Sequence, residues 1–155
     1  MEGYDAATYG QRVADVYDER TKGARPGQVE LLNELAGEGP VLELGIGTGR
    51  LALPLVTRGV EVYGIDSSAA MVAKLREKPG GDRISVSMGD FGDFDLAKRF
   101  SLVFVAFNTL FALPDQESQL SCFAAVSSHL LPAGRFLVEA FVPDLIWAAS
   151  TEASG

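Results

Sequence analysis

VLELGIGTGR, residues 41–50, is the most informative stretch of this 155-residue chain. An apolar run leads directly into glycines at alternate positions, Gly45, Gly47 and Gly49, and a helical pattern follows. In a parallel sheet such a turn lies at the carboxyl end of the first strand, where open α/β folds bind ligands. Glycine lets the main chain turn with positive φ and approach a ligand closely. The stretch therefore predicts a ligand crevice at the end of the first strand.

Short apolar runs alternate with helical stretches along the rest of the chain, an order typical of βαβ units. The pattern predicts an α/β fold, a Rossmann-like three-layer sandwich with a mostly parallel sheet. Strands are predicted at residues 40–44, 60–65, 83–88, 101–107 and 134–142, and helices at 8–18, 28–35, 49–57, 68–78 and 115–131. Thr48, and either Ser67 or Ser68, are placed to cap the third and fourth of these helices.

The last predicted helix has an acidic first turn and stops before Pro132. Its spacing predicts a buried stripe made of Leu120, Phe123, Ala124, Ser127, Leu130 and Leu131. His129 is expected to be solvated near the helix end, where its charge would favour the helix dipole.

Composition excludes several classes of function. With 21 acidic and 13 basic residues the formal charge is −8, so binding to nucleic acid or to an anionic membrane is not expected. One cysteine and one histidine leave too few ligands for a zinc site, and no metal site is expected. No apolar stretch approaches the roughly 20 residues of a membrane span, and the N-terminus has no signal-peptide pattern. We expect a soluble, cytoplasmic protein.

Asp66 ends the second predicted strand and is the first candidate for ligand contact. A carboxylate at this place can accept two hydrogen bonds from the vicinal hydroxyls of a ribose. The alternative is that Asp66, with the two serines after it, caps the next helix. The order of strand, glycine loop and acid favours ribose binding.

The glycine spacing indicates which ribose-containing cofactor is bound. A dinucleotide site requires G-x-G-x-x-G, but the third position is Arg50 here, and Gly49 comes one residue early. Glu43 and Asp90 add carboxylates at the same end of the sheet. Negative charge suits a ligand with an ammonium and a sulfonium better than a pyrophosphate. These residues favour S-adenosylmethionine, and a nicotinamide-dependent oxidoreductase is the weaker alternative.

At these residues the sequence resembles the class I S-adenosylmethionine-dependent methyltransferases over roughly residues 38–143. The resemblance is carried by five motifs, namely ELGIGTG (43–49), GIDSS (64–68) with Met71, GDF (89–91), FNTLFAL (107–113) and LLPAGRFLVEAF (130–141). The family's sheet has seven strands, and about five are present here. The predicted strand over 136–142 would then be an exposed apolar edge, with only residues 145–147 as further apolar sequence. Either the chain is a fragment of a longer enzyme or a second copy covers that edge as a homodimer.

The resemblance also implies a set of cofactor-binding residues. Gly45 and Gly47 would line the methionine portion, Asp66 would bind the ribose, and Asp90 with the Phe91 amide would contact the adenine edge. Met71 would pack on the adenine, and the main chain near Phe107 would meet the methionine ammonium. The full predicted set is Glu43, Gly45, Gly47, Gly49, Asp66, Ser67, Met71, Asp90, Phe91, Phe107 and Tyr17. Three alternatives stay open: Met71 as core, Asp90 as a turn residue, and Glu43 as a group that only orients the loop.

The N-terminal segment YDAATYGQRVADVYDE, residues 4–19, is similar to the lid helices of small-molecule methyltransferases. Tyr17 is the candidate to bind the cofactor carboxylate or to wall the acceptor pocket, and anchoring of the helix to the core is the alternative. We predict a lid over residues 1–38 and a cofactor-binding core over residues 39–155.

The predicted function is methyl transfer from S-adenosylmethionine to a small-molecule acceptor. Such a displacement depends mainly on orientation, so no catalytic residue is assigned. The alternative is a cofactor-binding module that is catalytically silent alone.

Overall fold

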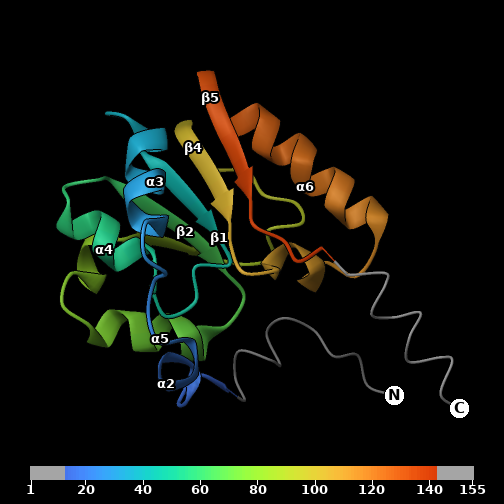
Figure 1. Cartoon of the computed structure of the whole chain (residues 1–155). Coiled ribbons are helices and arrows are strands. Elements are labelled where there is room, and N and C mark those ends of the chain that lie inside the picture. The colour runs from blue at the N-terminus through green and yellow to red at the C-terminus, as the bar shows by residue number, and fades with distance from the viewer. Residues whose placement is uncertain (1–12, 143–155) are drawn as a thin grey trace, which may run out of the picture.

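The computed structural model describes residues 13–142, and in this part of the chain five parallel strands form one sheet (Figure 1). The strands are β1 (Val41–Leu44), β2 (Val62–Asp66), β3 (Ser85–Met88), β4 (Phe100–Val105) and β5 (Leu130–Val138). Their order is β3-β2-β1-β4-β5, so the chain reverses its direction of travel across the sheet between β1 and β4. This reversal is the topological switch point, where α/β sheets bind their ligands. The parallel α/β fold predicted from the sequence is confirmed.

Helices cover both faces of the sheet, with α3 and α4 on one side and α6 on the other (Figure 1). The helices are α2 (Tyr17–Thr21), α3 (Gln28–Ala36), α4 (Ala52–Thr57), α5 (Ala69–Glu77) and α6 (Gln116–His129), with 3₁₀ turns η1 (Gly81–Arg83) and η2 (Thr109–Ala112). Within residues 13–142, no helix is long and apolar enough to cross a membrane.

Two apolar clusters separate the three layers. In β4, Leu102 and Phe104 face the cluster under α3 and α4, while Val103 and Val105 face the cluster under α6. All four side chains are fully buried, because helices lie on both faces of this strand. Alternation along a strand thus explains why β4 is apolar almost throughout.

The buried face of α6 differs from the predicted stripe. Cys122, Ala125, Val126 and His129 are buried, whereas Leu120 and Phe123 keep 62% and 39% of their surface exposed. The buried set has the same helical spacing as the predicted one, so spacing alone did not separate the two faces. Leu130 and Leu131, which were predicted to continue the helix, belong to β5 instead.

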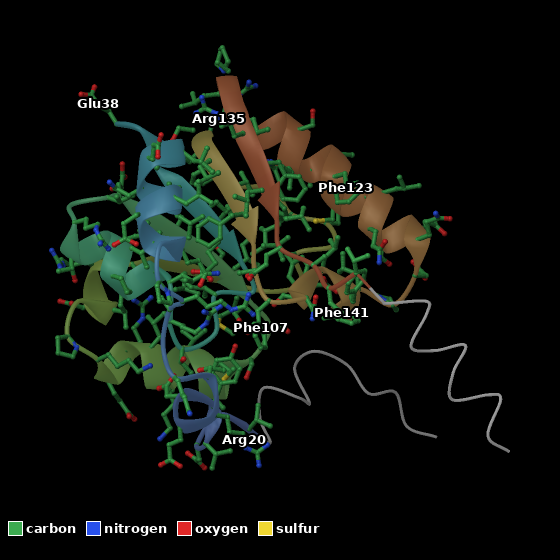
Figure 2. The ribbon with its side chains drawn as sticks, in the orientation of Figure 1. Arg20, Glu38, Phe107, Phe123, Arg135 and Phe141 are labelled. Carbon is green, nitrogen blue, oxygen red and sulfur yellow. The ribbon has the colours of Figure 1, made fainter. Side chains whose placement is uncertain are left out.

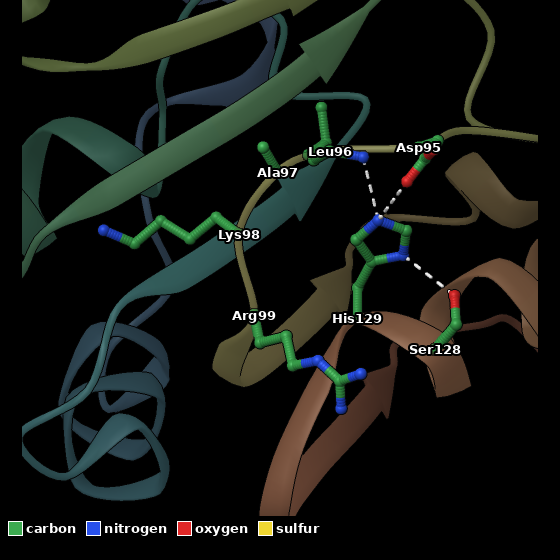
Figure 3. Close-up of a pocket in the computed structure, with 7 residues that line it drawn as sticks. All are labelled: Asp95, Leu96, Ala97, Lys98, Arg99, Ser128 and His129. Carbon is green, nitrogen blue, oxygen red and sulfur yellow. Dashed lines mark hydrogen bonds and ion pairs between the residues drawn. The ribbon is translucent and has the colours of Figure 1, made fainter.

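His129 is also buried, so the prediction of a solvated histidine was wrong. Its Nε2 accepts a hydrogen bond from the Leu96 amide at 2.8 Å, and its Nδ1 lies 2.7 Å from the Ala125 carbonyl oxygen. Figure 3 shows the ring enclosed by residues 95–99 and Ser128, at the amino end of β4. An uncharged imidazole satisfies both neighbours, and it fastens the segment before β4 to α6. This pocket lies at the opposite end of the strands from the glycine loop.

Several predicted boundaries also shift. The fourth strand ends at Val105 rather than at residue 107, because Phe107 and Asn108 both have positive φ and turn the chain. The fifth strand starts at residue 130 rather than 134 and ends at Val138. It lies at an edge of the sheet, as predicted, and Val138 is 38% exposed.

One predicted helix start is corrected and one predicted cap is confirmed. The helix predicted over 49–57 begins at Ala52 with Leu51 at its N-cap, so Thr48 lies too early to cap it, and the Thr48 hydroxyl donates to Asp18. Ser68 does cap α5, since its Oγ accepts a hydrogen bond from the Met71 amide. The helix predicted over 8–18 lies mostly outside the described residues, and α2 begins at Tyr17 in the described part. Tyr4, Tyr9 and residues 145–147 also lie outside the described residues.

Candidate functional site

The glycine loop after β1 starts with two hydrogen bonds to β2. The amides of Gly45 and Ile46 donate to the Ile65 carbonyl at 2.8 and 3.1 Å, which holds the loop against the neighbouring strand. Gly45, Gly47 and Gly49 have φ of 69°, 57° and 82°, a region that side chains with a Cβ rarely adopt. The sequence needs glycine at these positions because of this backbone conformation.

The three glycines make room for different neighbours. A Cβ on Gly45 would collide with Thr109, and one on Gly49 would lie 2.9 Å from Leu75 Cδ1. A Cβ on Gly47 would meet only Met71 Cε, at 3.6 Å. Gly45 and Gly49 thus permit close packing of protein on the loop, and Gly47 is where the main chain is most open to a ligand.

Asp66 connects the glycine loop with the start of α5. Its Oδ2 accepts a hydrogen bond from the Gly47 amide at 2.7 Å, and its Oδ1 accepts one from the Ser68 amide at 2.8 Å. Burial raises the pKa of Asp66 above its usual value, although these amide bonds and one from Ser67 oppose the shift. Each carboxylate oxygen has a second lone pair, so the observed role in the turn leaves room for bonds to ribose hydroxyls.

Glu43 is the least satisfied polar group of the site. It lies in β1 between Gly64 of β2 and Phe104 of β4, and only 5% of its surface is exposed. Its Oε2 is buried without a hydrogen-bond partner within residues 13–142. Burial raises the pKa of Glu43 well above its ordinary value; Arg50 opposes this shift and Asp66 adds to it. A buried, unpaired carboxylate oxygen is costly, and a cationic ligand would satisfy it.

At the far side of the loop, the predicted adenine contacts have different exposures. Met71 is 6% exposed, with its methyl group next to Gly47. Phe91 is buried, whereas Asp90 is exposed and its Oδ1 accepts a hydrogen bond from the Gly92 amide at 2.7 Å. Asp90 is therefore a turn residue in this structure, and its contact with adenine stays a prediction.

Phe107 lies two residues after the carboxyl end of β4, and Figure 2 labels it near the middle of the view. Its amide donates to Glu139 Oε2 at 2.9 Å, and its ring is 48% exposed. The guanidinium carbons of Arg25 and Arg50 lie 5.9 and 5.5 Å from the ring centroid, within the range of cation–π contacts. The end of β4 thus combines an exposed aromatic ring with two cations.

The N-terminal segment, defined here as residues 17–28, joins this constellation from outside the sheet. Arg25 and Gln28 donate to the two carboxylate oxygens of Glu139 at 3.0 and 3.1 Å. Asp18 accepts a hydrogen bond from the Thr48 hydroxyl at 2.6 Å. Tyr17, the predicted cofactor contact in this segment, is half-buried.

The structure brings most of the predicted set to one end of the sheet, and it adds residues that sequence reasoning missed. Arg25, Thr109 and Glu139 were not assigned, although Glu139 lies inside the motif at 130–141. Arg50 was noticed only as a departure from the dinucleotide pattern. No local pattern marks Arg25 or Asp18, because their partners are remote in sequence.

Comparison with known proteins identifies the family of this chain. Residues 41–134 match a family model described as a methyltransferase domain. The structure of the CcbJ methyltransferase from Streptomyces caelestis is 45% identical with a TM-score of 0.80, and the match covers 87% of this chain and 58% of that chain. The cypemycin N-terminal methyltransferase of Streptomyces sp is 26% identical over 144 residues, 90% of this chain and 58% of that protein.

A third relative was solved with the methyl donor. The glycopeptide N-methyltransferase MtfA complexed with S-adenosyl-L-methionine is 29% identical with a TM-score of 0.60, and the match covers 89% of this chain and 51% of that chain. The present chain thus spans between 51% and 58% of the length of these relatives. Because the family model covers more than half of the chain, the present chain belongs to the class I S-adenosylmethionine-dependent methyltransferase family.

Proposed function

We propose that this chain binds S-adenosylmethionine at the carboxyl ends of β1, β2 and β4, and that the whole protein transfers the methyl group to a small-molecule acceptor. The observation that carries the proposal is Glu43, a buried carboxylate with an unpaired oxygen beside an open glycine loop. A ligand with positive charge at this place offsets the cost of burying that carboxylate. A dinucleotide would bring its pyrophosphate into the same negative surroundings.

Each group of the site has a defined task in this proposal. The bound cofactor supplies an electrophilic methyl group on a sulfonium. The main chain at Gly47 permits close approach, and the Asp66 carboxylate accepts hydrogen bonds from the ribose. Glu43 attracts the cationic portion, and the turn at Phe107 bounds the methionine end. Orientation of the acceptor and exclusion of water then supply the acceleration.

We further propose that the acceptor atom is an amine nitrogen. Two of the relatives, the cypemycin enzyme and MtfA, are N-methyltransferases by name. A neutral amine attacks the methyl group without a base, which agrees with a site to which no general base is assigned. The cofactor contacts of Gly45, Gly49, Ser67, Met71, Asp90, Phe91 and Tyr17 stay part of this proposal.

The wider setting is also proposed. Residues 1–38 act as a lid over the core formed by residues 39–155, and the protein works in the cytoplasm without nucleic-acid or membrane partners. The net charge of −8 supports this view. We propose that a second copy covers the β5 edge, because Val138, Phe141 and Val142 are 38%, 64% and 82% exposed there. Sedimentation velocity at increasing concentration tests this: a chain that stays monomeric would refute the dimer.

Calorimetric titration tests the cofactor proposal. We expect saturable binding of S-adenosylhomocysteine and no saturable binding of NAD. Binding of NAD alone would refute the proposal. Transfer of a labelled methyl group from S-adenosylmethionine to amines in a metabolite extract tests the activity; cofactor binding with no labelled acceptor would favour the catalytically silent module.

A further inference from the structure

Three side chains from separate parts of the chain form a closed set of contacts, which we call the Asp18 cluster: Asp18, Thr48 and Lys78. The Thr48 hydroxyl donates to Asp18 Oδ1 at 2.6 Å, and Lys78 Nζ lies 2.5 Å from Asp18 Oδ2. Lys78 Nζ also donates to the Thr48 carbonyl oxygen at 2.9 Å. Each member therefore contacts the other two, and α2, the glycine loop and the end of α5 are joined.

The cluster acts on Thr48, in the middle of the glycine loop. Thr48 is 1% exposed and stands between Gly47, whose amide is held by Asp66, and Gly49. Two carboxylates thus hold the same loop. Asp66 accepts a hydrogen bond from the loop's main chain at Gly47, and Asp18 accepts one from the buried hydroxyl of Thr48. Loss of the Asp18 contact would leave the Thr48 hydroxyl without this partner, which costs free energy in a buried position.

The other end of the N-terminal segment is fastened at a distance from the cluster. Arg25 pairs with Glu139, just after β5, and Arg50 donates to the Gly23 carbonyl at 3.3 Å. In Figure 1 the segment runs from α2, past α5, to α3, and its contacts reach Thr48, after β1, and Glu139, after β5. It therefore crosses the carboxyl ends of the sheet and is held on both sides of the proposed cofactor site.

We propose that Asp18 is a positioning residue that locks the N-terminal segment onto the glycine loop, so that the cofactor leaves only after the Asp18 cluster opens. The inference rests on the proposed function, because the segment crosses the site assigned to the cofactor. Asp18 touches neither the reacting atoms nor the cofactor; it acts through Thr48 and through the segment.

The test compares the release of S-adenosylhomocysteine from the wild type, Asp18→Ala and Asp18→Asn in stopped-flow displacement. We expect release from Asp18→Ala to be about tenfold faster, the loss of one charge-assisted hydrogen-bonded group. Asp18→Asn keeps an acceptor for the Thr48 hydroxyl, so its release should lie between the two. Asp15→Asn is the matched control, because the Asp15 side chain, two residues before the segment, is 87% exposed and lies 3.2 Å from Lys74 Nζ of α5.

A second measurement needs no cofactor. Trypsin cleaves after Arg20 and Lys22, which lie in and just after α2. At a temperature well below the melting of all three proteins, we expect these bonds to be cut several-fold faster in Asp18→Ala than in the wild type and in Asp15→Asn. Equal cleavage in all three proteins would overturn the proposed lock, as would equal release rates.

The two proposals fail in different ways. A wild-type chain that binds no S-adenosylhomocysteine would refute the proposed function and the role of Asp18 in release, while proteolysis still decides whether Asp18 holds the segment. Tight binding in the wild type with the same release rate in Asp18→Ala would overturn the inference about Asp18 alone.

Discussion

Replacement of Glu43 by glutamine should stabilise the protein while weakening its affinity for the cofactor. The side chain is 5% exposed and one oxygen has no hydrogen-bond partner in the described part of the chain, so its charge is buried without compensation. Glutamine has nearly the same volume and removes that charge. The two effects have opposite signs because the buried charge lowers the stability of the chain when no cation is bound, but strengthens the binding of a cationic ligand.

The magnitude follows from burial. Burying an ionised group without full compensation costs several kcal/mol, and glutamine removes the charge but leaves a buried amide, so we expect Glu43→Gln to raise the free energy of unfolding by about 2 kcal/mol where the wild-type carboxylate is ionised. In a domain of this size that corresponds to a rise of roughly 4–8 °C in melting temperature. Loss of the carboxylate should weaken the binding of S-adenosylhomocysteine about tenfold, since its ammonium loses a charged partner.

The stability of the wild type and of Glu43→Gln should depend differently on pH. Burial raises the pKa of Glu43 in the folded chain above the ordinary 4.5, so the folded state holds this proton more tightly than the unfolded state. The wild type should therefore lose stability as pH rises from about 4.5 through the folded-state pKa, whereas Glu43→Gln lacks this loss. The gain from the substitution should be small at pH 4.5 and should grow as the pH rises through the folded-state pKa.

Urea denaturation of both proteins at pH 4.5, 6 and 8, with calorimetric titration at pH 8, measures all three effects. Glu30→Gln is the control: Glu30 pairs with Arg58, and its side chain is 62% exposed. A Glu43→Gln protein that is less stable than the wild type at pH 8, or whose stability follows the same pH profile, would refute the reasoning.

Other substitutions test the remaining assignments. Asp66→Ala should weaken binding of S-adenosylhomocysteine by about 1–3 kcal/mol in a calorimetric titration, and unchanged affinity would limit Asp66 to its bonds within the turn. His129→Ala should cost about 2–4 kcal/mol of stability, because it leaves the Leu96 amide unpaired and a cavity beside α6; a melting curve like that of the wild type would contradict this. Val126→Ala on the buried face of α6 should cost about 1–3 kcal/mol in urea denaturation, whereas Leu120→Ser should change stability by less than about 0.5 kcal/mol. A larger loss for Leu120→Ser would favour the originally predicted face.

Much of the fold could be predicted because its signals are local. The strand 41–44, the glycines after it and the acid at the end of β2 follow one another within a short stretch, and backbone conformation there depends on the residues themselves. Parallel strands then place their carboxyl ends at one edge of the sheet, so topology brings Glu43 and Asp66 together. Sequence alone thus determined the α/β class, the glycine loop and the family.

The buried face of α6 required the tertiary structure. Two neighbouring stripes on this helix have the same spacing, and the larger apolar residues lie on the more exposed one. Small residues such as Cys122 and Ala125 let the helix approach the sheet. The burial of His129 could not be predicted from its neighbours in sequence. Its hydrogen-bond donor, the Leu96 amide, lies 33 residues away along the chain.

The contacts of the N-terminal segment and the surroundings of Glu43 could be seen only in the folded chain. The contacts that fasten the N-terminal segment join residues 30 apart for Asp18 and Thr48 and 114 apart for Arg25 and Glu139. The unpaired oxygen of Glu43 likewise depends on what surrounds it in three dimensions. Backbone propensity and glycine conformation are properties of neighbouring residues, so the sequence reveals them. Burial and long-range charge pairing exist only once distant segments are packed together.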